Sequence, residues 1–216
     1  MSRPSSGEGA GKGSAPALTG AEVLPGIRGS VRSPRHRLLV GGSGMLSELS
    51  LQLAGDAVVT VVGRSRSRLA GLEQRSGGRI TGISVDYRHS AEFAAALQMA
   101  TLLRGPLTLA VAWLHDDAPD GLATITDRIV ADGVPAHLFH IRASSATAPF
   151  WPFILRQEFG PEGLVTYHEV TLGFRMEGGS SRWLRHGEIV AGVAEAIRTN
   201  RERSIVGVVR PWGMHP

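Results

Sequence analysis

The sequence predicts an α/β protein: a Rossmann-like, doubly wound and mostly parallel sheet of about seven strands with helices on both faces. Two observations lead to this fold class. Short apolar runs of strand type alternate with segments that carry an apolar stripe at helical spacing, from residue 37 onward. In addition, the first apolar run ends in a glycine-rich turn that passes at once into an amphipathic segment. Strands and helices that alternate in this way form parallel βαβ units with right-handed crossovers.

The elements follow from these runs in chain order. Seven short apolar runs are the predicted strands, at residues 37–41, 57–62, 80–85, 107–114, 136–141, 164–172 and 204–209. Apolar stripes at helical spacing predict helices over residues 45–54 and 91–103, around Leu122, Ile125 and Ile129, and over residues 187–200. Ser90 is the expected N-cap of the second of these helices. No repeat or internal linker divides the predicted domain.

Composition limits the classes of function. The 216-residue chain has no cysteine, which excludes disulfides, thiolate metal sites and a cysteine nucleophile. No apolar run approaches the roughly 20 residues that span a bilayer, and the N-terminal part lacks the apolar core of a signal peptide. We therefore expect a soluble, cytoplasmic protein without a membrane partner.

The basic character of the chain is concentrated near its N-terminus. Residues 1–37 hold six Lys or Arg and two Asp or Glu, which accounts for the whole net charge of +4. A solvated basic leader is not by itself a nucleic-acid site. Residues 1–34, rich in Ser, Gly and Pro, are predicted to be a disordered tail. Residues 35–216 are predicted to form one dinucleotide-binding domain with no specific nucleic-acid partner.

The glycine-rich turn predicts a phosphate-binding site between the first strand and the first helix. Gly41 suits the tight turn, and Gly44 lets the backbone approach a ligand closely. The first free N–H groups of the following helix and the helix dipole favour an anion. The candidate contacts of a dinucleotide pyrophosphate are therefore Gly41, Ser43, Gly44, Met45 and Leu46.

The ends of the second and third strands predict the kind of cofactor. In open parallel sheets the ligand lies beyond the carboxyl ends of the strands, where an NAD site usually has an acidic residue after the second strand. This chain has Arg64 and Ser65 there, which suit a ribose 2′-phosphate. NADP(H) is expected rather than NAD(H), and a methyltransferase is disfavoured. Asp86 and Tyr87 follow the third strand and are expected at the adenine, although an aspartate also suits a helix entry.

Taken together, these motifs resemble the short-chain dehydrogenase/reductase family, over residues 37–212. The glycine spacing is similar to that of atypical members with a GxxGxxG turn, with Ser47 in the place of the third glycine. The resemblance implies an oxidoreductase that transfers hydride between NADP(H) and a small carbonyl or imine substrate. It also implies that Ser145 polarises the substrate carbonyl and that the backbone of Gly173 meets the nicotinamide amide.

The catalytic Tyr-x-x-x-Lys pair of that family is absent. The only lysine is Lys12, and the residues four positions beyond Tyr87 and Tyr167 are Ala91 and Thr171. In the family the lysine lowers the pKa of the tyrosine, which donates a proton to the substrate. Either other groups supply that proton here, or the protein is a catalytically inactive NADP-binding sensor or regulator.

The end of the fourth strand offers one source of acid–base chemistry. His115 follows that strand and can exchange protons near neutral pH, with Asp116 or Asp117 to set its tautomer. Ala112 is expected to line the cofactor. Trp113 is expected in the core or the pocket wall.

Tyr167 is the third candidate catalytic residue, beside Ser145 and His115. It lies on the sixth predicted strand. His137 and His140 lie three residues apart on the fifth, so they point to opposite faces and no metal site is predicted. Residues 180–182 are expected to form a substrate-side loop. The expected partners are a small-molecule substrate and further copies of the chain in a homo-oligomer.

Overall fold

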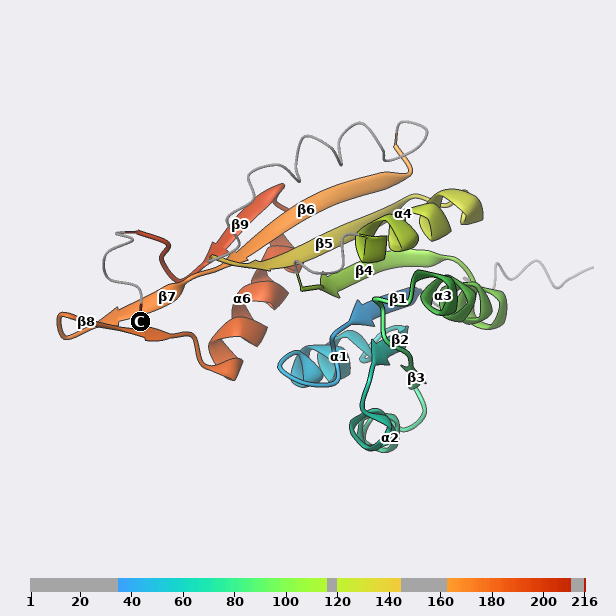
Figure 1. Ribbon diagram of the computed structural model, residues 1–216, viewed down its shortest axis with the longest axis horizontal. Coiled ribbons are helices and arrows are strands. Elements are labelled where there is room, and N and C mark those ends of the chain that lie inside the picture. The colour runs from blue at the N-terminus through green and yellow to red at the C-terminus, as the bar shows by residue number, and fades with distance from the viewer. Residues whose placement is uncertain (1–34, 116–119, 145–162, 211–215) are drawn as a thin grey trace, which may run out of the picture. The chain divides into compact units, whose positions relative to one another are not determined.

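A seven-stranded parallel sheet organises the protein (Figure 1). The computed structural model describes residues 35–115, 120–144, 163–210 and 216, which belong to one compact unit. The strands follow the order β3-β2-β1-β4-β5-β6-β9, and all neighbours are parallel. They are β1 (His36–Val40), β2 (Val58–Gly63), β3 (Ile80–Ser84), β4 (Leu107–Trp113), β5 (Ala136–Ala143), β6 (Val165–Leu172) and β9 (Arg203–Val206). Because the strand order reverses between β1 and β4, the predicted doubly wound fold is confirmed.

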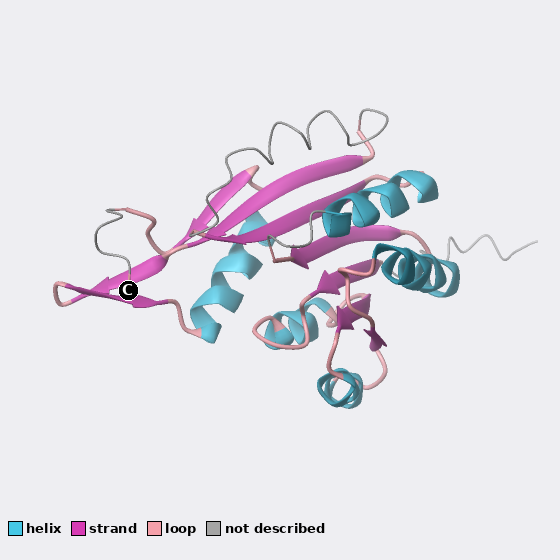
Figure 2. Cartoon of the chain, in the orientation of Figure 1, coloured by secondary structure: helices cyan, strands magenta, loops and turns pink. Residues whose placement is uncertain are grey.

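Helices cover both faces of this sheet (Figure 2). One face carries α1 (Ser47–Leu53), α2 (Arg66–Arg75) and α6 (His186–Thr199), and the other carries α3 (Ser90–Arg104) and α4 (Asp120–Asp132). Leu39 of β1 belongs to the same apolar core as Leu49 of α1 and Val193 of α6. Its neighbour Leu38 packs with Phe93 of α3 in the second core. Alternate strand residues thus fill opposite cores, as a sheet covered on both faces requires.

The strand predictions hold to within two residues at each end, except at the end of β9. That strand stops at Val206 because the next residue, Gly207, has a φ of 81° and turns the chain away. None of the helices in the described ranges has both the length and the apolar character needed to cross a membrane.

Three predicted helix starts were wrong by one or two residues, and the last of them is that of α6, which begins at His186 and not at residue 187. The first helix begins at Ser47, not at residue 45, because the preceding residues form a turn in which the Ser47 N–H donates to Gly44 O at 3.0 Å. The second begins one residue earlier than predicted. His89 takes the N-cap position, and the Phe93 N–H donates to His89 O at 2.9 Å, so Ser90 is the first helical residue and not the cap.

Helix α2 was missed in the sequence because it carries a short apolar stripe. Its only buried side chains are Leu69 and Leu72. A polar cap starts it instead, since Ser65 lies in the extended region and its Oγ accepts the Arg68 N–H at 3.4 Å.

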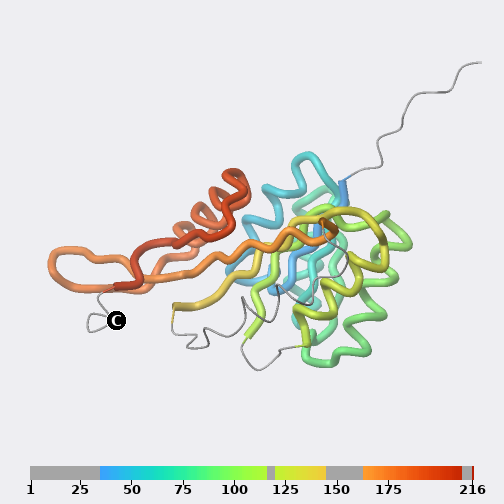
Figure 3. The backbone as a smooth tube through the Cα atoms, turned by 90° about the horizontal axis from the view of Figure 1, so that it is seen from above, coloured from blue at the N-terminus to red at the C-terminus, as the bar shows by residue number. Residues whose placement is uncertain are grey.

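A β-hairpin replaces the loop predicted at residues 180–182. Strands β7 (Phe174–Glu177) and β8 (Ser180–Trp183) pair antiparallel and extend away from the main sheet (Figure 3). Gly178 and Gly179 form the two-residue turn with φ values of 59° and 84°, which suits a type I′ hairpin. At the base, Phe174 is fully buried and exchanges two backbone hydrogen bonds of 2.9 Å with Val208. The glycine pair was the sequence signal for this hairpin.

We predict that Gly192→Ala destabilises the protein, because a Cβ there would collide with both methyl groups of Val206 in β9. The free energy of unfolding should fall by about 1–3 kcal/mol, in spite of the higher helix propensity of alanine. Gly187→Ala in the same helix is the matched control, since a Cβ there meets nothing within 4 Å. Urea denaturation compares the two variants with the parent. Equal stability of all three proteins would contradict this packing of α6 on β9.

Candidate functional site

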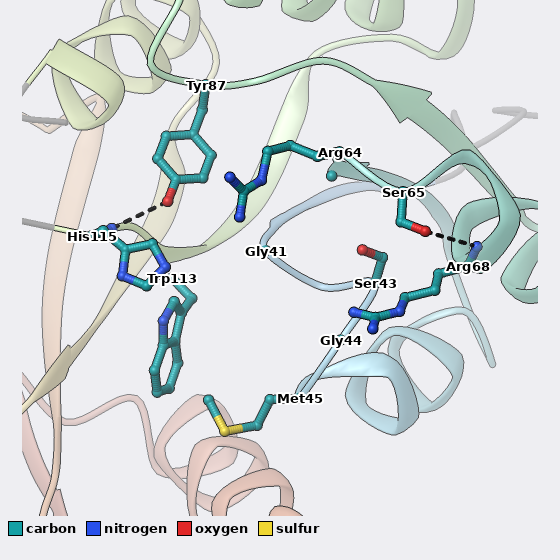
Figure 4. Close-up of a pocket in the computed structure, with 11 residues that line it drawn as sticks. Gly41, Ser43, Gly44, Met45, Arg64, Ser65, Arg68, Tyr87, Trp113 and His115 are labelled. Atoms are coloured by element: carbon teal, nitrogen blue, oxygen red, sulfur yellow. Dashed lines mark hydrogen bonds between the residues drawn. The ribbon is translucent and has the colours of Figure 1, made fainter. Parts of the chain in front are cut away.

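A pocket opens at the carboxyl ends of β1, β2 and β4, beside the point where the strand order reverses (Figure 4). Its volume is about 390 Å³, within the usual range of small-molecule sites. The lining residues are Gly41, Ser43, Gly44, Met45, Gly63, Arg64, Ser65, Arg68, Tyr87, Trp113 and His115. The structure therefore brings together residues that follow the first four strands, which is where the sequence predicted the cofactor.

Two glycines let the turn after β1 lie between its neighbouring strands. Gly41 has a φ of 77°, and a Cβ on it would lie 2.9 Å from Trp113 O of β4. Its N–H donates to Val62 O of β2 at 3.0 Å. A Cβ on Gly63, the last residue of β2, would lie 2.6 Å from Ser43 Oγ. The position of Gly41 excludes a side chain, whereas one at Gly63 would require the Ser43 hydroxyl to move.

Gly44 differs from these two glycines. It lies outside the left-handed region, and a Cβ on it would meet only Arg68 Nη1, at 3.7 Å, among the described atoms. A side chain at this position would enter the pocket and not the protein core.

Two arginines give the pocket its charge. Arg64 and Arg68 are exposed, and neither side chain forms an ion pair or hydrogen bond with any residue that the structure describes. Other arginines do form such pairs; Arg37, for example, binds Asp56 at 2.7 Å. None of the described residues that line the pocket is a carboxylate, and the nearby Asp86, which lies outside the lining, interacts electrostatically with Arg64. This arrangement favours an anionic ligand.

Aromatic residues form the opposite side of the pocket. Figure 4 shows Trp113 and His115 across from Ser65 and Arg68. Tyr87 is buried, and its hydroxyl accepts the backbone N–H of His115 at 3.3 Å. The bond joins the loop after β3 to the end of β4, while the imidazole of His115 remains exposed.

Asp86 lies next to Tyr87 but does not line the pocket. Its carboxylate pairs with Arg88 at 2.7 Å, and the hydrogen bonds from that guanidinium lower the pKa of Asp86 to about 2. The aspartate thus has a local partner in the loop, the alternative that the sequence left open.

Three other predicted cofactor contacts also lie outside the pocket. Leu46 and Ala112 are fully buried in the two apolar cores. Gly173 is buried at the end of β6, where its N–H donates to Val206 O at 2.9 Å. A Cβ on Gly173 would collide with Val208 O. This glycine allows the segment after β9 to pack closely, and its N–H is already bonded.

Tyr167 is the third residue of β6 and lies near the amino end of that strand, away from the pocket. Its register partner in β5 is Leu138, and its hydroxyl is 2.9 Å from His140 Nδ1. Burial lowers the pKa of His140 to about 4 and raises the pKa of Tyr167 above its usual range. Both groups are therefore neutral at pH 7. They form a buried pair away from the pocket.

His137 lies on the opposite face of β5 from His140. Its Nδ1 is 3.0 Å from His168 Nε2, and His168 Nδ1 is 2.9 Å from Arg201 O. Within the described ranges, no three His, Asp or Glu side chains are grouped as metal ligands. Ser145, Asp116 and Asp117 lie outside the described residues.

Sequence reasoning missed two lining residues, Gly63 and Arg68, and left Trp113 between core and pocket wall. Arg68 follows the Ser65 cap by three residues, so recognising that cap would have placed it in the first turn of a helix. No local pattern marks Gly63, whose role depends on the turn that packs against it.

Comparison with known proteins was informative only at the level of structure. No protein-family model matches the sequence, and no curated protein matches it. The fold is similar to that of a short-chain dehydrogenase/reductase from Burkholderia phymatum in complex with NAD, with a TM-score of 0.63 and 12% identity over 81% of this chain and 89% of that chain.

Two further solved structures show the same likeness. A short-chain type dehydrogenase/reductase from Mycobacterium marinum gives a TM-score of 0.62 at 15% identity over 81% of this chain and 94% of that chain. A short-chain dehydrogenase from Streptomyces avermitilis gives 0.62 at 14% identity, over 82% and 89%. The chain therefore has the Rossmann-like fold of the short-chain dehydrogenases/reductases, as its motifs predicted.

We predict that alanine lowers the free energy of unfolding much more at Gly41 than at Gly44. Gly41→Ala should lower the free energy of unfolding by about 2 kcal/mol or more, because it adds left-handed strain to the contact with Trp113 O. Gly44→Ala should change it by less than about 1 kcal/mol. Thermal and urea unfolding measure both. A Gly44→Ala variant as unstable as Gly41→Ala would contradict the open position of Gly44.

Proposed function

We propose that the protein is an NADP(H)-dependent oxidoreductase that transfers hydride to or from a small carbonyl or imine substrate. The observation that carries the proposal is a pair of arginines, Arg64 and Arg68, that form no ion pair with the described residues and line a pocket at the carboxyl ends of the described strands. In this fold such a pocket is the expected place for a dinucleotide. The pocket fits a multiply charged anion with an aromatic ring.

The preference for NADP(H) over NAD(H) rests on the residues after β2. An NAD site uses an acidic side chain here to bind the ribose 2′-hydroxyl, whereas this chain has a guanidinium. A 2′-phosphate would supply the negative charge that the described lining of the pocket lacks, and a guanidinium binds phosphate through two hydrogen bonds. Ser65 adds a hydroxyl at the same end of the pocket.

Different residues would bind the cofactor, exchange the proton and polarise the substrate carbonyl. Arg64, Arg68 and the turn at Gly41 would bind the cofactor, which supplies the hydride-transfer chemistry when bound. His115 has an exposed imidazole on the pocket wall and would exchange a proton with the substrate. Ser145 would polarise the carbonyl, by its resemblance to the family serine.

A second candidate function is an NADP-binding sensor without turnover. Two observations favour it over an enzyme. The N–H of Gly173, which the family resemblance assigns to the nicotinamide amide, donates to Val206 O. The Tyr167 hydroxyl is bonded to buried His140, and no Tyr-x-x-x-Lys pair replaces it. Binding would then be retained without the usual proton donor.

We predict that NADPH binds more tightly than NADH and that Arg64→Ala removes most of the difference. A charge-assisted contact of about 1.5–3 kcal/mol corresponds to a tenfold to hundredfold change in the ratio of the two dissociation constants. Trp113 lines the pocket, so tryptophan fluorescence can follow the titration, with calorimetry as a check. Arg66→Ala is the matched control, because this exposed arginine is close in sequence but does not line the pocket. Equal affinities of the parent for the two cofactors would refute the NADP preference.

We predict that an active enzyme loses turnover in His115→Ala and in Ser145→Ala. Each variant should lower kcat by about a hundredfold with little change in NADPH affinity, because proton transfer contributes only in the transition state. His186→Ala, an exposed histidine outside the pocket, controls for the loss of a histidine. The assay follows NADPH oxidation over a panel of carbonyls and imines. If no substrate turns over while NADPH changes the oligomeric state, the sensor function is supported instead.

A further inference from the structure

We propose that the two arginines recognise different phosphates of one ligand, so that the pocket is a site for a nucleoside bisphosphate. Arg64 would bind the phosphate on the ribose, and Arg68 the phosphate chain attached at the 5′ position. This inference rests on the proposed function and deepens it, because it assigns the pyrophosphate to a side chain and not to the helix that follows the glycine turn.

The positions of the two guanidinium groups are the first support. Arg64 follows β2 directly, whereas Arg68 lies in the first turn of α2. Arg68 Nη1 is 3.7 Å from the Cβ position of Gly44, so it lies over the glycine turn. In Figure 4 the Arg64 side chain extends instead toward Tyr87 and Gly41. The two guanidinium groups therefore lie in different parts of the pocket.

Ser65 lies between the two arginines in the sequence. It is the N-cap of α2, with its Oγ accepting the Arg68 N–H at 3.4 Å. Ser65 itself is extended and Arg68 is helical, so Arg64 and Arg68 leave the backbone on either side of the cap. If both arginines bound the same phosphate, a second phosphate of the ligand would have no guanidinium to bind it in the described lining of the pocket.

The glycine turn itself is a weak anion site in this chain. Helix α1 has only seven residues, and its N-cap, Leu46, makes no side-chain cap bond. The N–H of Ser47 already donates to Gly44 O, so it is not free to bind an anion. A cation from another element is therefore needed beside Gly44. Arg68 is the lining residue that supplies it.

The test compares ligands that differ in one phosphate. NADH carries the pyrophosphate but no 2′-phosphate, whereas NADPH carries both. Arg68→Ala should weaken both cofactors by about tenfold or more, so that the ratio of their dissociation constants stays within about twofold of the parent. Arg64→Ala should change that ratio and weaken NADH by less than about threefold. Arg66→Ala should leave both affinities unchanged.

Fragments give a second measurement. 2′-AMP should lose affinity in Arg64→Ala only, 5′-ADP in Arg68→Ala only, and 2′,5′-ADP in both. Both side chains are exposed, and circular dichroism verifies that each variant is folded.

The outcomes separate this inference from the function on which it rests. If Arg68→Ala abolishes the preference for NADPH, or weakens 2′-AMP as much as 5′-ADP, both arginines bind the 2′-phosphate and the division is wrong. The proposed NADP(H) binding would still stand in that case. If neither cofactor nor any fragment binds the parent protein, the proposed function and the division are both overturned.

Discussion

The close approach of the β1–α1 turn to its two neighbouring strands determines the rest of the site. Gly41 fits against the backbone of Trp113, and Gly63 makes room for Ser43. A side chain at Gly41 would collide with the backbone of β4, and one at Gly63 would displace the Ser43 hydroxyl. The residues after β2 and β4 then face one another across a floor of backbone. A pocket results where three strands end.

Charge is distributed unevenly over this framework. On the rest of the described surface, arginines such as Arg75 and Arg198 pair with glutamates, and such exposed pairs contribute little to stability. The cations in the pocket have no such partner among the described residues. An anion bound in the pocket would supply the charge partner that these two guanidinium groups lack in the described lining.

The sequence was most informative where a residue acts through its neighbours in the chain. The place of Arg64 after a strand predicted its position at the pocket, and the apolar periods identified the strands of the main sheet. The sequence did not predict how segments that are distant in the chain pack against one another. Tyr167 alternates correctly between the faces of β6, but its level along the strand depends on its register with β5, which no local pattern specifies. Gly173 likewise could not be interpreted without the segment that packs on it.

Gly63 shapes the pocket through the turn that packs against it. It is the last residue of a buried strand, and its lack of a side chain serves the turn that lies against it. A larger residue would displace Ser43 and reshape the floor of the pocket while leaving the charged groups intact. The shape of the pocket floor thus depends on the packing of a strand end against a neighbouring loop.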